Sequence, residues 1–189
     1  MDTIIQNLKH VQQRIDEACK AAGRDPKEVK LLLATKTVSP ERIQRALAAG
    51  YTLIAENKVQ ELKEKYEALK STPHTNHFIG HLQTNKIKDI LKCEVSCVES
   101  LDRYDLAEKL HQKLSQAGRE MDVFIQVNTS GEESKFGVAP EQALELTRQV
   151  AQLPTLHIRG LMTIGLFSAE EDKVRKCFQL LKRIQQEII

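Results

Sequence analysis

Polar side chains that could do chemistry stand directly after short apolar runs in this 189-residue sequence. Lys36 follows the run at residues 29–35, and the pair Glu56-Asn57 follows the run at 52–55. Later runs are followed by further polar or sulfur-bearing residues: His81, Glu99, Asn128, Lys135, Met162 and Thr163. Residues that follow buried parallel strands gather at one edge of the sheet, where pockets form. The spacing therefore predicts a site built from several strand ends.

Lys36 offers the most specific chemistry of this set. An amine at the end of a buried strand loses hydration, so its neutral form becomes more accessible and can attack a carbonyl to form a Schiff base. The alternative is a surface lysine whose amine reaches solvent, which is the commoner situation after a strand. Residue type and position leave both interpretations open.

The other strand-end residues also have structural alternatives. Asn57 could cap the following helix. His81 comes just after Gly80, whose missing side chain would let a ligand approach the backbone, but a structural histidine fits equally well. Lys135 belongs to a long polar loop at residues 129–137, and we expect a mobile loop with a solvated Lys135.

Several functions are disfavoured by what the sequence lacks. There is no G-x-S-x-G elbow, no paired Cys-His signature and no glycine-rich phosphate loop after any apolar run. The four cysteines have no second close pair at ligand spacing, so we expect them reduced and buried, with no bound metal.

Charge and hydropathy point to a protein of the cytoplasm. The 28 basic and 26 acidic residues give a net charge of +2, and Trp is absent, which disfavours a nucleic-acid partner. Basic residues stand beside acids, as in residues 61–65, which is typical of a solvated exterior. No apolar run has the length of a membrane span, and the N-terminus has no basic leader, so no membrane association is expected.

The elements that must position these residues alternate regularly. An amphipathic helix is predicted over residues 4–19, followed by six strand-then-helix units. The strands are predicted at residues 29–35, 52–55, 78–80, 95–98, 123–127 and 158–162. Helix starts are predicted at Ser39-Pro40, after Ser100 or Asp102, and at Pro140. Such units form a parallel sheet, and the missing phosphate loops favour a barrel over a doubly wound sheet.

Five blocks of residues, in the right order, resemble the pyridoxal-phosphate homeostasis proteins, which are relatives of the N-terminal barrel of alanine racemase. The blocks are residues 33–37, 56–61, 77–86, 126–128 with 134–137, and 160–164. The resemblance implies an α/β fold, a TIM-like (β/α)8 barrel of the alanine racemase N-terminal type. We expect one domain over residues 1–189, with an N-terminal helix at 1–21 packed on it. A complete barrel has eight units in about 250 residues, so two units are expected to be missing.

The resemblance also implies a function. Lys36 would carry pyridoxal 5′-phosphate (PLP) as a Schiff base, Asn57, His81, Asn128 and Met162 would line the pocket, and Lys135 would lie on a nearby loop. The implied role is intracellular PLP homeostasis and amino-acid and keto-acid balance, without clear catalytic turnover. We expect a monomer that binds PLP and hands it to apo-enzyme clients.

The sequence departs from the family pattern in two places, and each departure leads to an expectation about the structure. Asn76 stands where Trp is usual, so that side of the sheet is expected to be repacked or more exposed. The family continues past residue 189 with segments that cradle the cofactor phosphate. We expect either a longer natural protein or a truncated chain with weaker affinity and a tendency to associate.

Two other functions stay open. One is a PLP-dependent enzyme that acts on amino acids, like a racemase, although racemisation needs a second base on the opposite face of the cofactor. The other is an interaction module that works through its helical exterior.

Overall fold

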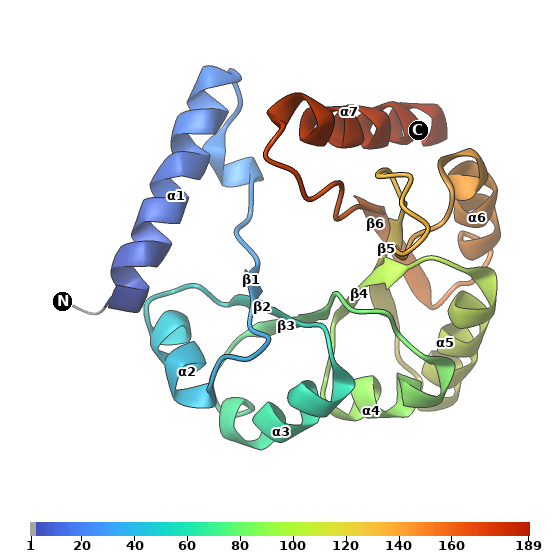
Figure 1. Ribbon diagram of the computed structural model, residues 1–189. Helices are drawn as coiled ribbons and strands as arrows, with labels where there is room; N and C mark the ends of the chain where they lie inside the picture. Colours follow the sequence, from blue (N-terminus) through green and yellow to red (C-terminus); the bar gives the residue numbers. More distant parts are fainter. Residues whose placement is uncertain (1–2) are drawn as a thin grey trace. The chain divides into compact units, whose positions relative to one another are not determined.

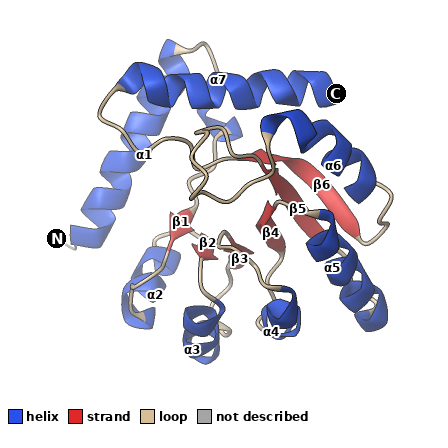
Figure 2. Cartoon of the chain, turned by 45° about the vertical axis from the view of Figure 1, so that its right-hand side comes forward, coloured by secondary structure: helices blue, strands red, loops and turns tan. Residues whose placement is uncertain are grey.

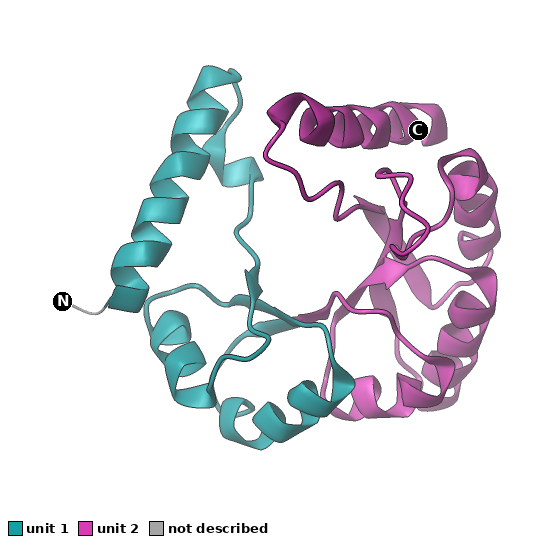
Figure 3. Cartoon of the chain, in the orientation of Figure 1, with its two compact units in different colours: residues 1–76 teal, residues 77–189 magenta. Residues whose placement is uncertain are grey.

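The computed structural model describes residues 3–189 as two compact units, unit 1 (Met1–Asn76) and unit 2 (His77–Ile189), coloured separately in Figure 3. The strand order in the sheet is β1-β2-β3-β4-β5-β6, which is the order of the chain. The third strand, β3 (Thr75–Phe78), spans the junction of the two units.

Unit 1 begins with an amphipathic helix and continues with two short strands. Its elements are α1 (Thr3–Ala21), a 3-10 turn (Pro26–Glu28), β1 (Leu33–Ala34), α2 (Pro40–Ala48), β2 (Leu53–Glu56) and α3 (Val59–Leu69) (Figure 1). Strands β1 and β2 are parallel, with Leu33 opposite Ile54. The core of this unit is formed by Ile43, Leu47, Ile54 and Leu69. The apolar stripes of α2 and α3 are thus buried, as their spacing requires.

Unit 2 is a run of four parallel strands with helices between them. After β3 come a 3-10 turn (Thr84–Lys86), α4 (Ile87–Lys92), β4 (Cys97–Leu101), α5 (Tyr104–Ala117), β5 (Met121–Gln126), a 3-10 turn (Pro140–Gln142), α6 (Ala143–Val150), β6 (Leu156–Met162) and α7 (Glu171–Ile188). Helices α4, α5 and α6 lie side by side along one face of β4–β6 (Figure 2). Neighbouring strands pair in parallel throughout.

The alternating pattern is confirmed, with differences at the element ends. The strand predicted at residues 78–80 lies at Thr75–Phe78, because His77 and Phe78 pair with Cys97 and Val98 of β4. Of the predicted helix starts, Ser39-Pro40 is confirmed and the one at Ser100 or Asp102 is wrong. Ser39 occupies the N-cap position of α2 without a side-chain capping bond, and Arg103 replaces Ser100 or Asp102 at the start of α5.

The first strand differs most from its prediction. We expected a buried strand over residues 29–35, but only Leu33 and Ala34 join the ladder, Leu33 is half-buried and Ala34 is exposed. The strand order gives β1 a single neighbour, so it pairs along one edge only. None of the helices within residues 3–189 has the length and apolar character needed to span a bilayer.

Candidate functional site

Lys36 lies on a turn directly after β1, and both of its neighbours are fixed to other elements of unit 1. On one side, the buried Thr35 hydroxyl donates a 2.7 Å hydrogen bond to Oε1 of Glu56. On the other side, Thr37 has a left-handed φ of 61°, and its backbone N–H donates a 2.6 Å hydrogen bond to Oε2 of Glu61. Lys36 itself is exposed, so of the two interpretations left open by the sequence the amine that reaches solvent is the one observed. The turn therefore holds the backbone in place and leaves the amine free to reach a ligand.

The buried Lys65 connects Glu56 and Glu61, the two residues that accept these hydrogen bonds. Nζ of Lys65 donates to the Thr35 carbonyl at 2.9 Å, to Oε1 of Glu56 at 2.7 Å and to Oε2 of Glu61 at 3.0 Å. Burial works to lower the pKa of Lys65, but the two carboxylates outweigh it and raise that pKa. The Thr37 amide, followed by Lys65, lowers the pKa of Glu61. Lys65 and Glu61 therefore both favour their charged forms beside the Lys36 turn.

Lys65 was missed at the level of the sequence, where residues 61–65 were interpreted as a solvated exterior. That interpretation is wrong for Lys65, which is only 8% exposed. The sequence did contain an indication of this burial. Lys65 comes three residues after Leu62 and four before Leu69, so it lies on the inward stripe of α3.

Asn57 follows Glu56 at the end of β2 and does not cap the next helix. The N-cap of α3 is Lys58, which makes no side-chain capping bond, so the capping alternative is wrong. Within the described residues, Oδ1 of Asn57 is buried and has no hydrogen-bond partner. A buried acceptor without a partner costs free energy, so a donor group on a ligand would be favoured here.

In unit 2, the loop after β5 is ordered by Asn128. Its Nδ2 donates to the carbonyls of Glu132 at 2.9 Å and Lys135 at 3.2 Å, and its Oδ1 accepts from both the amide and the hydroxyl of Ser130. These four bonds use the full capacity of a side-chain amide. Asn128 thus builds the loop that carries Lys135.

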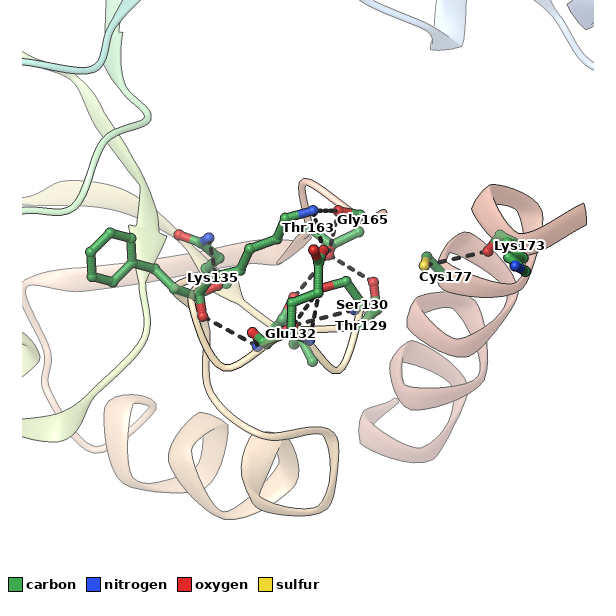
Figure 4. A network of polar contacts seen from close by, with 12 residues as sticks. Thr129, Ser130, Glu132, Lys135, Thr163, Gly165, Lys173 and Cys177 are labelled. Atoms are coloured by element: carbon green, nitrogen blue, oxygen red, sulfur yellow. Dashed lines mark hydrogen bonds and ion pairs between the residues drawn. The ribbon is translucent and has the colours of Figure 1, made fainter. Parts of the chain in front are cut away.

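Lys135 is half-buried and its amine is held by protein atoms, which corrects the expectation of a solvated side chain. Its Nζ donates to the Gly165 carbonyl at 2.8 Å and forms an ion pair with Glu132 (Figure 4). The hydrogen bond from Lys135 lowers the pKa of Glu132. Beside this pair the hydroxyls of Thr129 and Thr163 lie 2.9 Å apart, so the segments after β5 and β6 are joined by side chains.

His81 and Met162 complete the group at this end of unit 2. The His81 ring stacks on Phe136, with ring centroids 4.0 Å apart, and its Nδ1 lies 3.8 Å from Asp102. Met162 ends β6, and its carbonyl accepts a hydrogen bond from Val127 at 2.9 Å. His81, Asn128, Lys135 and Met162 therefore come from the ends of three strands and the loop after β5. The structure places Lys36 and Asn57 at two neighbouring strand ends of unit 1.

Comparison with known proteins decides the family. The family model described as "Alanine racemase, N-terminal domain" matches residues 2–188. A curated relative from Aquifex aeolicus, named pyridoxal phosphate homeostasis protein, is 41% identical over 183 residues, covering 97% of this chain and 80% of the relative. This chain belongs to the pyridoxal phosphate homeostasis protein family.

Two solved structures extend the comparison of this family member. A crystal structure of an unknown protein from Bifidobacterium adolescentis has a TM-score of 0.92 at 35% identity and covers 100% of this chain and 81% of that protein. The structure of PipY from Synechococcus elongatus with PLP bound has a TM-score of 0.79 at 27% identity, covering 92% of this chain and 81% of PipY. The expected fold class, of the alanine racemase N-terminal type, is confirmed.

Asn76 was expected to leave its side of the sheet either repacked or more exposed. In the structure Asn76 is 8% exposed and therefore buried. It lines a small cavity of unit 1 together with Tyr66 and His74. This side of the sheet is therefore not more exposed at Asn76.

Proposed function

We propose that this chain binds PLP through Lys36 and acts in PLP homeostasis. The observation that carries the proposal is the turn around Lys36, whose two neighbours are held by a buried network while the amine stays exposed. A protein that stores or delivers an aldehyde needs an amine that is fixed in position and yet accessible. Membership in the family and the PLP-bound relative PipY support the same cofactor.

PLP supplies an aldehyde, which condenses with a lysine amine to form a C=N bond with release of one water. In this chain Nζ of Lys36 would provide the amine. The contacts of Thr35 and Thr37 would hold the backbone of Lys36 in place while the C=N bond forms. Asn57 Oδ1 would accept a hydrogen bond from the bound molecule, because it has no other partner among the described residues. We propose that His81, Asn128 and Met162 border the same cofactor and that Lys135 stays on the loop beside it.

The proposal includes delivery of PLP to apo-enzyme clients by a monomer in the cytoplasm, together with an influence on amino-acid and keto-acid balance. The cysteines agree with a reducing compartment, since all four are buried and none forms a disulfide. We expect no catalytic turnover. A racemase-like enzyme would exchange the α-hydrogen of an amino acid with solvent deuterium, whereas the proposed carrier would leave that hydrogen in place.

The decisive experiment is a titration of the purified chain with PLP, followed by borohydride reduction, digestion and mass analysis. We expect the absorbance of a lysine-bound PLP and a reduced adduct on the peptide that contains Lys36. Lys36→Ala should lose both signals. Lys30→Ala is the matched control, because Lys30 is an exposed lysine in the same segment and should keep them. An unchanged adduct in Lys36→Ala would disprove the assignment.

A further inference from the structure

A second group of reactive side chains lies in unit 2, on β3 and β4. A ring nitrogen of His77, Sγ of Cys97 and a carboxylate oxygen of Glu99 all lie within 4.8 Å of one another. His77 and Cys97 are direct partners in the parallel ladder, and Glu99 lies two residues further along β4 on the same face. Cys97 is 2% exposed, and the other two are half-buried. Rigid strands therefore bring an imidazole, a thiol and a carboxylate together.

The proposed PLP role uses none of these three residues. Side chains alternate between the two faces of a strand, so Phe78 and Val98, the next pair in the ladder, point to the opposite face, where both are fully buried. If these three side chains had no role, we would expect apolar residues at their positions on β3 and β4. Instead, a 2.6 Å hydrogen bond joins His77 to Glu99 next to the thiol.

We propose that His77, Cys97 and Glu99 form a binding site for a zinc-type divalent cation. Imidazole, thiolate and carboxylate are the three ligand types that Zn²⁺ takes in proteins. Three protein ligands leave the fourth tetrahedral position to water. The charges also balance, because a thiolate and a carboxylate neutralise a divalent cation. This site is independent of the proposed PLP function, so the failure of one proposal would leave the other unaffected.

Only small rearrangements are needed to accept the ion. Tetrahedral geometry with bonds near 2.1 Å separates ligand atoms by about 3.4 Å, so the His77–Glu99 contact must open by somewhat less than 1 Å. The proton on Nδ1 of His77 would move to Nε2, and Cys97 would release its thiol proton to solvent. Without an ion, burial and then the charges of Glu99 and Asp122 raise the pKa of Cys97 to about 12, so the thiol stays protonated.

The neighbouring charges do not block the site. Asp122 lies opposite Cys97 in the ladder, and it is held by Arg159 at 2.9 Å. This pair is neutral overall, so it neither repels a cation strongly nor supplies a free fourth ligand. Binding of the cation would therefore depend on the three proposed ligands, so replacing any one of them should weaken it.

The test uses Co²⁺ as a spectroscopic probe on the purified, PLP-free full chain. We expect one equivalent to give the near-ultraviolet charge-transfer absorption of a cobalt–thiolate bond, with Zn²⁺ displacing the cobalt. Cys97→Ser should abolish the band. Cys93→Ser is the matched control, because Cys93 is also buried but lies outside the group, and it should keep the band. Glu99→Gln should weaken Co²⁺ binding by at least about tenfold.

Circular dichroism establishes that each variant is folded. If Cys97→Ser fails to fold, Glu99→Gln decides the question, because it keeps the thiol and the apolar packing and changes only a ligand atom. Absence of the thiolate band at saturating Co²⁺ would overturn the proposal. The same band in Cys97→Ser, or unchanged Co²⁺ affinity in Glu99→Gln, would also overturn it and leave His77 and Glu99 as a structural hydrogen-bonded pair.

Discussion

Lys65 lies within α3 and Lys70 directly follows its last residue, and each forms an ion pair. Of the Lys65–Glu56 and Lys70–Glu67 pairs, only the first is buried. The side chains of that pair are 10% and 3% exposed, whereas those of Lys70 and Glu67 are 48% and 73% exposed. Removing one member of a buried pair leaves the other charge without compensation. Burial, and not the number of ion pairs, should therefore decide the cost of losing each lysine.

We predict that Lys65→Met lowers the free energy of unfolding by about 3 kcal/mol or more, because it strands the Glu56 carboxylate and also removes the bond to Thr35. Lys70→Met, the matched control, should cost less than about 1 kcal/mol. Urea denaturation of the purified variants measures both values. Equal losses in the two variants would contradict the burial argument.

Single residues differ in how much of their environment is determined by the local sequence. The position of Lys36 after the first strand followed from the order of apolar and polar residues. Its anchoring did not, because Glu61 and Lys65 belong to the next helix and reach Thr35 and Thr37 only after β1 and β2 have paired. Likewise, no local pattern predicts that His81 stacks on Phe136, which lies 55 positions further along the chain (136 − 81).

At the scale of elements, the loop after β5 depends on one glycine. Gly137 has a φ of +127°, and a Cβ at this position would lie 2.5 Å from the backbone nitrogen of Asn128. The close approach allows Val138 to pair with Gln126 and Asn128. A side chain here would have to push the backbone of the loop away from the end of the strand.

We predict that Gly137→Ala destabilises the protein by at least about 3 kcal/mol, combining backbone strain with a steric clash. Gly131→Ala in the same loop is the control. Gly131 also has a positive φ, but nothing lies within 4 Å of its added Cβ, so only about 1 kcal/mol should be lost. Thermal and urea unfolding give both numbers. A comparable loss at Gly131 would show that φ alone, and not the close approach, limits this loop.

The same loop should respond to acid through Glu132. Its pKa is lowered in the folded protein by Lys135, so its contribution to stability is fully present above the unfolded pKa of about 4.3 and is lost as the pH falls through the lower folded value. We predict that Glu132→Gln is less stable than the native chain at neutral pH and that the difference disappears in acid. Unfolding free energies of both proteins across this range measure it, and a difference independent of pH would refute the assignment.

The elements themselves were predictable to different degrees. Helices α1, α3 and α5 followed from apolar stripes at steps of three and four, which depend only on the helix's own residues. Strand ends were less accurate, because the register of β3 is set by its partner β4 and by the 2.8 Å bond from the Thr75 amide to the Thr52 carbonyl. The start of α5 also depends on tertiary contacts, since the Ser100 hydroxyl donates to the Gly80 carbonyl and does not cap the helix.

At the scale of the whole chain, ligand binding offers a test that does not depend on any single contact. A ligand that binds only the folded state raises its stability by RT ln(1 + [L]/Kd), which is about 2.7 kcal/mol at 100 times Kd. If Lys36 forms the covalent bond, PLP should raise the melting temperature of the native chain. Lys36→Ala should lose most of that increase, because only the non-covalent contacts remain.

Pyridoxine 5′-phosphate separates these two contributions, since it has the same ring and phosphate but a hydroxymethyl group in place of the aldehyde. We predict that it stabilises the native chain and Lys36→Ala equally, and less than PLP stabilises the native chain. The additional increase with PLP then measures the bond to Lys36 in the intact protein. If PLP and pyridoxine 5′-phosphate raise the melting temperature of the native chain by the same amount, the aldehyde is not engaged, and the chain recognises the cofactor by shape and charge alone.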